Sequence, residues 1–216
     1  MIYIENIFVC IAAPLLVATI SMGENYYHIF LFFIAGMGAC LLSAYINSFF
    51  ARVYNADLIN TTTQIAPVVE EIMKLLPLLF YLLVLEPRPG EIKNAMMIVA
   101  ASFATFENIC CLIQSGADQL SFLLIRGFGT GAMHIVCGAI AGYGLMYVWQ
   151  RSWLKIPGTF GLLCAAITYH AVYNLLIAHS GTSRYFAYGL PIFTIAAGMA
   201  AHRLLKALPH HETLDS

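Results

Sequence analysis

The chain has 216 residues, of which 61% are hydrophobic and only 10% are charged, and its mean hydropathy is +0.81. Because roughly a quarter of the residues of soluble domains are charged, this composition excludes an ordinary soluble protein and indicates a chain embedded in a lipid bilayer. The formal net charge of −1 argues against nucleic acid as a partner, since binding to a polyanion requires an excess of basic residues.

Apolar segments long enough to cross a bilayer, about 20 residues each, follow one another along the chain. Short polar connections such as "MGENYY" and "EPRPGEIKN" separate them. We therefore predict an all-α fold, a polytopic membrane helical bundle of about seven transmembrane helices. A single integral membrane domain is expected over 1–208, with a polar C-terminal tail over 209–216. The expected spans are 4–22, 28–50, 65–85, 94–113, 120–149, 158–178 and 185–207.

The distribution of lysine and arginine over the connections predicts the orientation of the bundle. Cytoplasmic loops of membrane proteins carry an excess of basic residues. With the N-terminus outside, six basic residues lie on the cytoplasmic side and two on the outer side, which favours a cytoplasmic C-terminus. The cytoplasmic residues are Arg88, Lys93, Arg151, Lys155, Arg203 and Lys206, and the outer ones are Arg52 and Arg184.

The third predicted span, "APVVEEIMKLLPLLFYLL", carries three charges within five positions: Glu70, Glu71 and Lys74. Each such charge costs roughly 2.5–3.5 kcal/mol at the centre of a bilayer. A structural interpretation is a buried salt bridge between Glu70 and Lys74, which are spaced i,i+4. The alternative is a functional site, because ionisable residues within membrane spans usually mark one.

Further ionisable side chains in later spans fall at a similar depth. Counted from the outer ends of their helices at ~1.5 Å per residue, Glu107 and His170 lie in the same layer as the two adjacent glutamates. His134 joins this layer if the long fifth span tilts or protrudes at the glycine-rich stretch "RGFGTGAMH". A lone histidine in a bundle is more often a packing residue, and Asn174 would then orient His170. Because all of these ionisable residues converge on one layer, a functional site is favoured over a purely structural role for the set.

The chemistry that this set suits best is the activation of water. A carboxylate in a partly dry cavity is a competent general base. Two histidines and a third carboxylate can hold a zinc ion, Zn²⁺, which takes three protein ligands and a water at catalytic sites. Lys74 or Arg126 would stabilise an oxyanion or keep one glutamate ionised.

Four motifs of the chain resemble those of the PrsW-type intramembrane proteases, a family related to the CAAX prenyl endopeptidases and the abortive-infection proteases. They are "EEIMK" from Glu70, "FATFEN" ending at Asn108, the segment from Arg126 to His134, and "HAVYN" from His170. They occur in the family's order over about half of the chain. The CAAX relatives have a histidine at Glu107 and an arginine at Lys74, so a prenylated substrate is not expected.

The resemblance implies an integral endopeptidase of a prokaryotic cell membrane, which cuts a membrane-anchored, anti-sigma-factor-like protein just outside the bilayer. It implies Glu70 and Glu71 as the catalytic acidic pair, and we assign further roles to the remaining polar residues. Lys74 and Asn174 are expected to be catalytic, Asn108 and Arg126 supporting, and Glu107, His134 and His170 ligands of Zn²⁺. A glutamate–histidine mechanism without a metal remains open.

Two other functions are consistent with part of the pattern. A proton-coupled transporter would use buried glutamates and histidines as a relay, but a relay should run from face to face rather than gather in one layer. A non-catalytic membrane scaffold of the same fold would have no need of both glutamates and both histidines.

Overall fold

The structure, a computed structural model, describes residues 3–21, 27–115, 124–179 and 181–207. These residues form helices and turns, without any strand among them, so the all-α prediction is confirmed. The predicted tail 209–216 and the first residues of the fifth predicted span, 120–123, lie outside them. The elements are α1 (Ile4–Ser21), α2 (Tyr27–Val53), α3 (Leu58–Asn60), η1 (Thr61–Ile65), α4 (Ala66–Val84), α5 (Pro89–Ser115), η2 (Arg126–Gly131), α7 (Ala132–Val148), η3 (Ser152–Leu154), α8 (Lys155–Ala178) and α9 (Thr182–Ala207).

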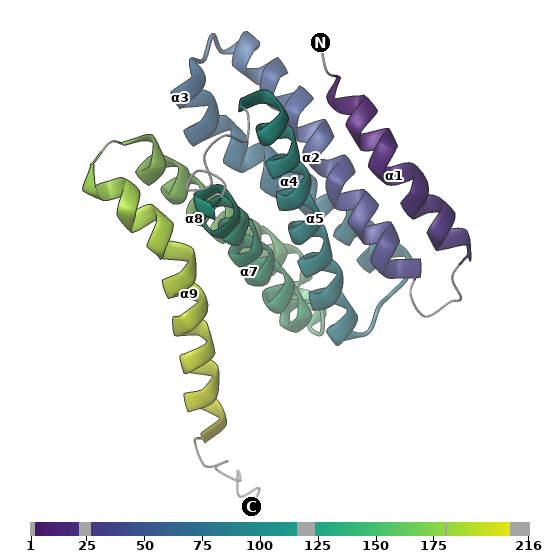
Figure 1. Ribbon diagram of the computed structural model, residues 1–216. Helices are drawn as coiled ribbons and strands as arrows, with labels where there is room; N and C mark the ends of the chain where they lie inside the picture. Colours follow the sequence, from purple (N-terminus) through teal and green to yellow (C-terminus); the bar gives the residue numbers. More distant parts are fainter. Residues whose placement is uncertain (1–2, 22–26, 116–123, 180, 208–216) are drawn as a thin grey trace, which may run out of the picture.

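The helices alternate in direction along the bundle (Figure 1). α1 begins at the upper end of the view, and α9 leaves the bundle and ends beyond its lower end. The turn between α2 and α3 is at the upper end, whereas the turn between α4 and α5 is at the lower end. The beginnings of α4 and α7 and the ends of α5 and α8 therefore all lie towards the upper end.

Four helical stretches of the described residues are long and apolar enough to cross a membrane, namely Tyr27–Val53, Pro89–Gln114, Arg126–Val148 and Ser152–Ala178. These stretches identify an integral membrane protein. α4 falls outside this group although it is mostly apolar, since Glu70, Glu71 and Lys74 all lie within its 19 residues. Large apolar side chains such as Phe80, Phe160 and Phe193 are 65%, 67% and 73% exposed, as expected where lipid rather than water covers the surface.

α5 is the central helix, since it packs against α2, α4 and α7. Small residues make this close packing possible. A Cβ atom on Gly36 of α2 would lie 2.0 Å from Ser102 Oγ and 2.4 Å from the carbonyl oxygen of Val99. A Cβ on Gly138 of α7 would lie 2.4 Å from the Cβ of Ala100. α2 and α7 thus contact two different faces of α5 at nearly backbone distance.

The predicted connection 51–64 is largely helical, which corrects the boundary of the third span. Asp57 directly precedes α3, and its side chain accepts a hydrogen bond of 2.7 Å from the backbone N–H of Asn60 and so caps the helix. The hydroxyl groups of Thr61 and Thr63 donate back to the carbonyl oxygens of Asp57 and Ile59, both at 2.7 Å. Such back-bonding bends helices, and here it accompanies the wide π-helical turns of η1 just before α4.

Candidate active site

Four helices bring the predicted polar residues to one place in the upper half of the bundle. Glu70, Glu71 and Lys74 lie in the first turns of α4, and His134 lies in the first turn of α7. Glu107 and His170 each lie eight residues before the end of their helix, α5 and α8, or ~12 Å along its axis. Because these four helix ends point the same way, the side chains meet at one depth.

A buried ion pair lies at the back of the site. Lys74 Nζ donates to Glu71 Oε1 at 2.6 Å, and the two side chains are 0% and 1% exposed. The spacing predicted a salt bridge of Lys74 with Glu70, and this prediction is wrong, because the acidic partner of Lys74 is Glu71. Both acids are within reach of the lysine along the helix, and the rotation of α4 in the bundle selects Glu71.

Each member of this ion pair also contacts one of the two histidines. Glu71 Oε1 lies 2.7 Å from His170 Nδ1, and Lys74 Nζ lies 2.9 Å from His134 Nδ1. The two imidazole rings are nearly perpendicular, with centroids 5.0 Å apart. The ring of Phe103 covers His134 at 5.2 Å and Lys74 at 4.6 Å. The ring thus closes the site on the side of α5 with an apolar surface that favours the lysine charge.

Glu107 joins η2 to the site. Its Oε2 lies 2.5 Å from His134 Nε2, and its Oε1 accepts a hydrogen bond of 2.6 Å from Arg126 Nη2. Both side chains of the Glu107–Arg126 pair are 25% exposed. The carboxylate therefore has both oxygens engaged, and the glycine-rich η2 is tied to α5 through it.

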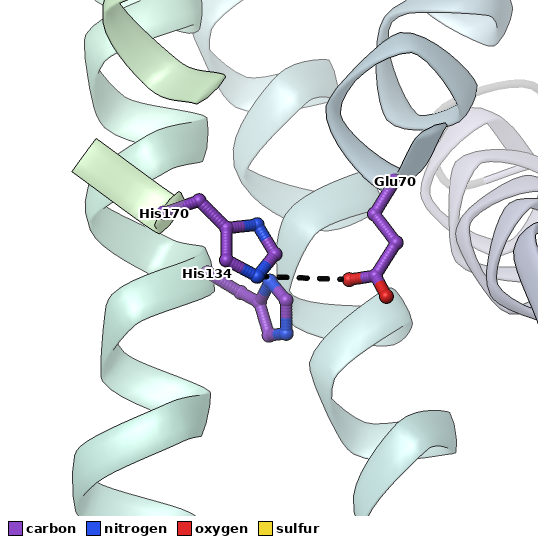
Figure 2. Close-up of side chains that lie close together, drawn as sticks. All are labelled: Glu70, His134 and His170. Carbon is purple, nitrogen blue, oxygen red and sulfur yellow. Dashed lines mark ion pairs between the residues drawn. The ribbon is translucent and has the colours of Figure 1, made fainter. Parts of the chain in front are cut away.

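Glu70 is the more accessible of the two adjacent acids. Its side chain is 13% exposed, and its Oε2 lies 3.8 Å from His170 Nε2, as Figure 2 shows with Glu70 directed towards the two imidazoles. Asn47 of α2 donates to Glu70 Oε1 at 3.3 Å. Glu70 also lines a pocket of about 220 Å³, whose other polar lining residues are Thr62, Glu107, Arg126, Thr130, His170, Tyr173 and Asn174.

Asn174 and Asn108 lie at the edge of this arrangement. Asn174 Nδ2 donates to the carbonyl oxygen of Thr62 at 2.9 Å, so the residue ties α8 to η1 while lining the pocket. Asn108, next to Glu107 on α5, instead lines a separate groove of about 370 Å³ beside η2, α7 and α9. The structure thus brings together all the predicted site residues except Asn108.

Both helices that begin at the site, α4 and α7, are preceded by π-helical turns, η1 and η2. Single π-helical turns are rare and occur frequently at functional sites. Gly127, Gly129 and Gly131 weaken the preference for a regular α-helix in η2. The hydroxyl groups of Thr130 and Tyr173 lie 3.4 Å apart and join η2 to α8.

Among the described residues, Glu70, His134 and His170 form a group that could hold a metal ion, with one ligand atom from each within 4.8 Å of the others. Nitrogen and carboxylate oxygen atoms are suitable ligands for Zn²⁺. This group differs from the predicted ligands in its carboxylate, Glu70 in place of Glu107. His170 fits a ligand role well, since Glu71 orients it through Nδ1 and leaves Nε2 directed towards Glu70.

Asn47, Thr130 and Tyr173 are further residues of the site that were not predicted from the sequence. The sequence could have indicated Asn47, because it is an amide near the outer end of an otherwise apolar predicted span. It could not have indicated Thr130 and Tyr173, since threonine and tyrosine are common in membrane helices and only their position in the fold identifies these two.

The chain was compared with known proteins. The family model described as "PrsW family intramembrane metalloprotease" matches residues 24–200. The comparisons with curated proteins and with solved structures found no significant match. The matched region contains every residue of the site described above, and the chain is therefore a membrane-embedded peptidase that belongs to the PrsW family of intramembrane metalloproteases.

Proposed function

We propose that the protein hydrolyses a peptide bond of a membrane-anchored protein, of the anti-sigma-factor type, near the extracytoplasmic face of a prokaryotic cell membrane. The observation that carries this proposal is the pocket of about 220 Å³ in which Glu70, Glu107 and His170 meet. Carboxylates and imidazoles in a site with little water are suited to activating water for attack on an amide.

Glu70 is the acid that activates the water in this proposal. Its side chain lines the pocket, and its Oε2 lies beyond hydrogen-bonding distance of His170 Nε2, at 3.8 Å. Glu71, by contrast, is buried and already accepts hydrogen bonds at the same oxygen from Lys74 and His170. Glu71 therefore positions other groups, whereas Glu70 can take a proton from a water in the pocket.

A second form of the proposal includes Zn²⁺: Glu70 and His170, which each have an atom directed into the site, would then hold the ion, and Glu70 would be a ligand rather than the base. When bound, the ion would polarise the scissile carbonyl group and make a water more acidic. Arg126 keeps Glu107 ionised and in place through the contact of 2.6 Å. Asn174, at the pocket, is the proposed donor to the oxygen of the scissile carbonyl.

The proposed side of the membrane rests on the charge of the connections together with the arrangement of the helices. The end of the bundle that contains the site carries Arg52 and Arg184, whereas Arg88 and Arg151 lie in the turns at the other end. The end opposite the site has more basic residues and is therefore proposed to face the cytoplasm. The site then lies within ~12 Å of the outer end of its helices. A substrate would then be cut close to its emergence from the bilayer.

The test is cleavage in proteoliposomes. The purified protein is reconstituted with a single-pass substrate whose segment just outside the membrane carries a randomised sequence, and mass spectrometry identifies the new ends. We expect products cut within a few residues of the extracytoplasmic boundary, and none with the Glu70→Gln variant. Equal cleavage by that variant, or cuts confined to the cytoplasmic side, would contradict the proposal.

A further inference from the structure

The buried ion pair of Glu71 and Lys74 contacts the same atom, Nδ1, of two different histidines. His170 Nδ1 faces the carboxylate at 2.7 Å, and His134 Nδ1 faces the ammonium group at 2.9 Å. All four side chains are at most 2% exposed. Water therefore does not compete for these contacts, and the ion pair decides where each imidazole carries its proton.

The two partners have opposite hydrogen-bonding properties. A carboxylate only accepts hydrogen bonds, so His170 carries its proton on Nδ1. An ammonium group only donates, so His134 has the lone pair on Nδ1. In its neutral form an imidazole has one N–H, which places the proton of His134 on Nε2 and leaves the lone pair of His170 on Nε2.

The atoms on the other side of the rings agree with this assignment independently. His134 Nε2 lies 2.5 Å from Glu107 Oε2, and this carboxylate requires a donor at that distance. His170 Nε2 lies 3.8 Å from Glu70 Oε2, too far for a hydrogen bond. The first distance fits an Nε2–H, and the second leaves room between the two atoms.

We propose that Lys74 is a positioning residue that fixes His134 as a hydrogen-bond donor, while Glu71 fixes His170 as an acceptor. The two histidines of the site are thus not equivalent. Only His170 presents a lone pair that can bind a metal ion or accept a proton. His134 does not serve as a metal ligand; it holds Glu107 through Nε2–H, and Glu107 in turn holds Arg126.

The metal site that the distances alone indicate therefore loses one of its three ligands. Glu70, His134 and His170 are close enough to share an ion, but Nε2 of His134 is protonated and its Nδ1 faces a cation. Ligation by His134 would require Lys74 to lose its proton or to leave a buried position beside Glu71. Glu70 and His170 then remain as the two protein ligands free to bind. The role of this metal rests on the proposed function, whereas the proton positions do not.

Nitrogen-15 NMR of histidine-labelled protein in lipid tests the proton positions directly, because the shifts of protonated and unprotonated ring nitrogens differ widely. The signals of His134 and His170 among the seven histidines are assigned from the variants His134→Gln and His170→Gln. We expect His134 as the Nε2–H form and His170 as the Nδ1–H form. An Nδ1–H signal for His134 in the wild type would overturn the proposal.

Two lysine variants and added Zn²⁺ complete the test. Lys74→Met removes the donor and is expected to give His134 a mixture of both tautomers, whereas Lys74→Arg is expected to restore Nε2–H. Zn²⁺ should leave the Nε2–H signal of His134 in place, and loss of that signal on addition of zinc would refute the inference. None of these measurements uses a substrate. A failure of the proposed protease function would therefore not affect the tautomer result. A failure of the tautomer assignment would likewise not affect the proposed protease function.

Discussion

Two adjacent glutamates of α4 have different surroundings, although they carry the same chemical group. Glu71 is enclosed between Lys74 and His170, whereas Glu70 lines the pocket with Asn47 beside it. Glu71→Gln removes the negative partner of a buried ammonium group, and breaking a buried ion pair costs about 3–5 kcal/mol. Glu70→Gln leaves that pair intact and removes only the pocket carboxylate.

The first prediction concerns these two substitutions. Glu70→Gln should retain the thermal stability of the wild type in detergent and lose at least about 100-fold in cleavage rate, the usual contribution of a general base. Glu71→Gln should unfold at a markedly lower temperature. Thermal unfolding followed by circular dichroism, with the cleavage assay, separates the two. A stable Glu71→Gln variant with full activity would show that the assignment is wrong.

The second prediction concerns metal content. Purified wild-type protein should bind Zn²⁺ at a stoichiometry of about one, as for a mononuclear catalytic site, measured by mass spectrometry of the metal. His170→Gln should lose the ion, because it removes the proposed nitrogen ligand. His134→Gln, whose amide can still donate to Glu107, should keep it and provides the matched control. Metal lost from His134→Gln alone would contradict the proposed ligands.

At the scale of the elements, α5 holds the site together because α2 and α7 approach it at glycines. α2 also packs against α4, where Asn47 lies beside Glu70, and the contact of α7 with α5 places His134 beside Glu107. Gly36 lies in the middle of this packing, where a Cβ would overlap the backbone of Val99. Gly161 on α8 has no atom within 4 Å of the position of an added Cβ.

We therefore predict that Gly36→Ala destabilises the protein by about 1–3 kcal/mol, the usual cost of overpacking a dense interior. Gly161→Ala should be neutral or slightly stabilising, since alanine is favoured over glycine in helices by about 1 kcal/mol. Chemical denaturation in detergent compares the two variants with the wild type. Equal stability of both variants would mean that α2 and α5 are not packed as closely as the structure has them.

At the scale of the whole molecule, the site lies towards one end of the bundle, so the orientation in the membrane decides on which side a substrate is cut. Tyr54, 69% exposed, lies in the turn at the end that contains the site, and Ser152 is the first residue of η3 at the opposite end. The excess of basic residues at the latter end predicts that it is cytoplasmic.

A cysteine-free background with Tyr54→Cys or Ser152→Cys tests this orientation in intact cells. A thiol reagent that does not cross membranes should label the cysteine at 54 without permeabilisation, and the cysteine at 152 only after it. The reverse pattern would invert the topology and move the predicted cut to the cytoplasmic side.

The sequence by itself determined the helical membrane bundle and its approximate helix boundaries. These features follow from apolar composition and from the cost of a charge in lipid, both of which are local properties of the chain. Helix direction and rise also indicated that Glu70, Glu107 and His170 reach one layer, because depth depends only on counting along each helix. Counting placed His134 in that layer only on the condition that the fifth predicted span tilts or protrudes.

The tertiary structure decided how these side chains face one another. Adjacent residues point ~100° apart around a helix, so the rotation of α4 against α2 and α8 determines that Glu71 meets Lys74 and His170 while Glu70 faces the pocket. That rotation is fixed by packing between helices far apart in sequence, since α4 packs against α2 and α8. For the same reason only the structure revealed the contact of Asn47 with Glu70 and that of Lys74 with His134.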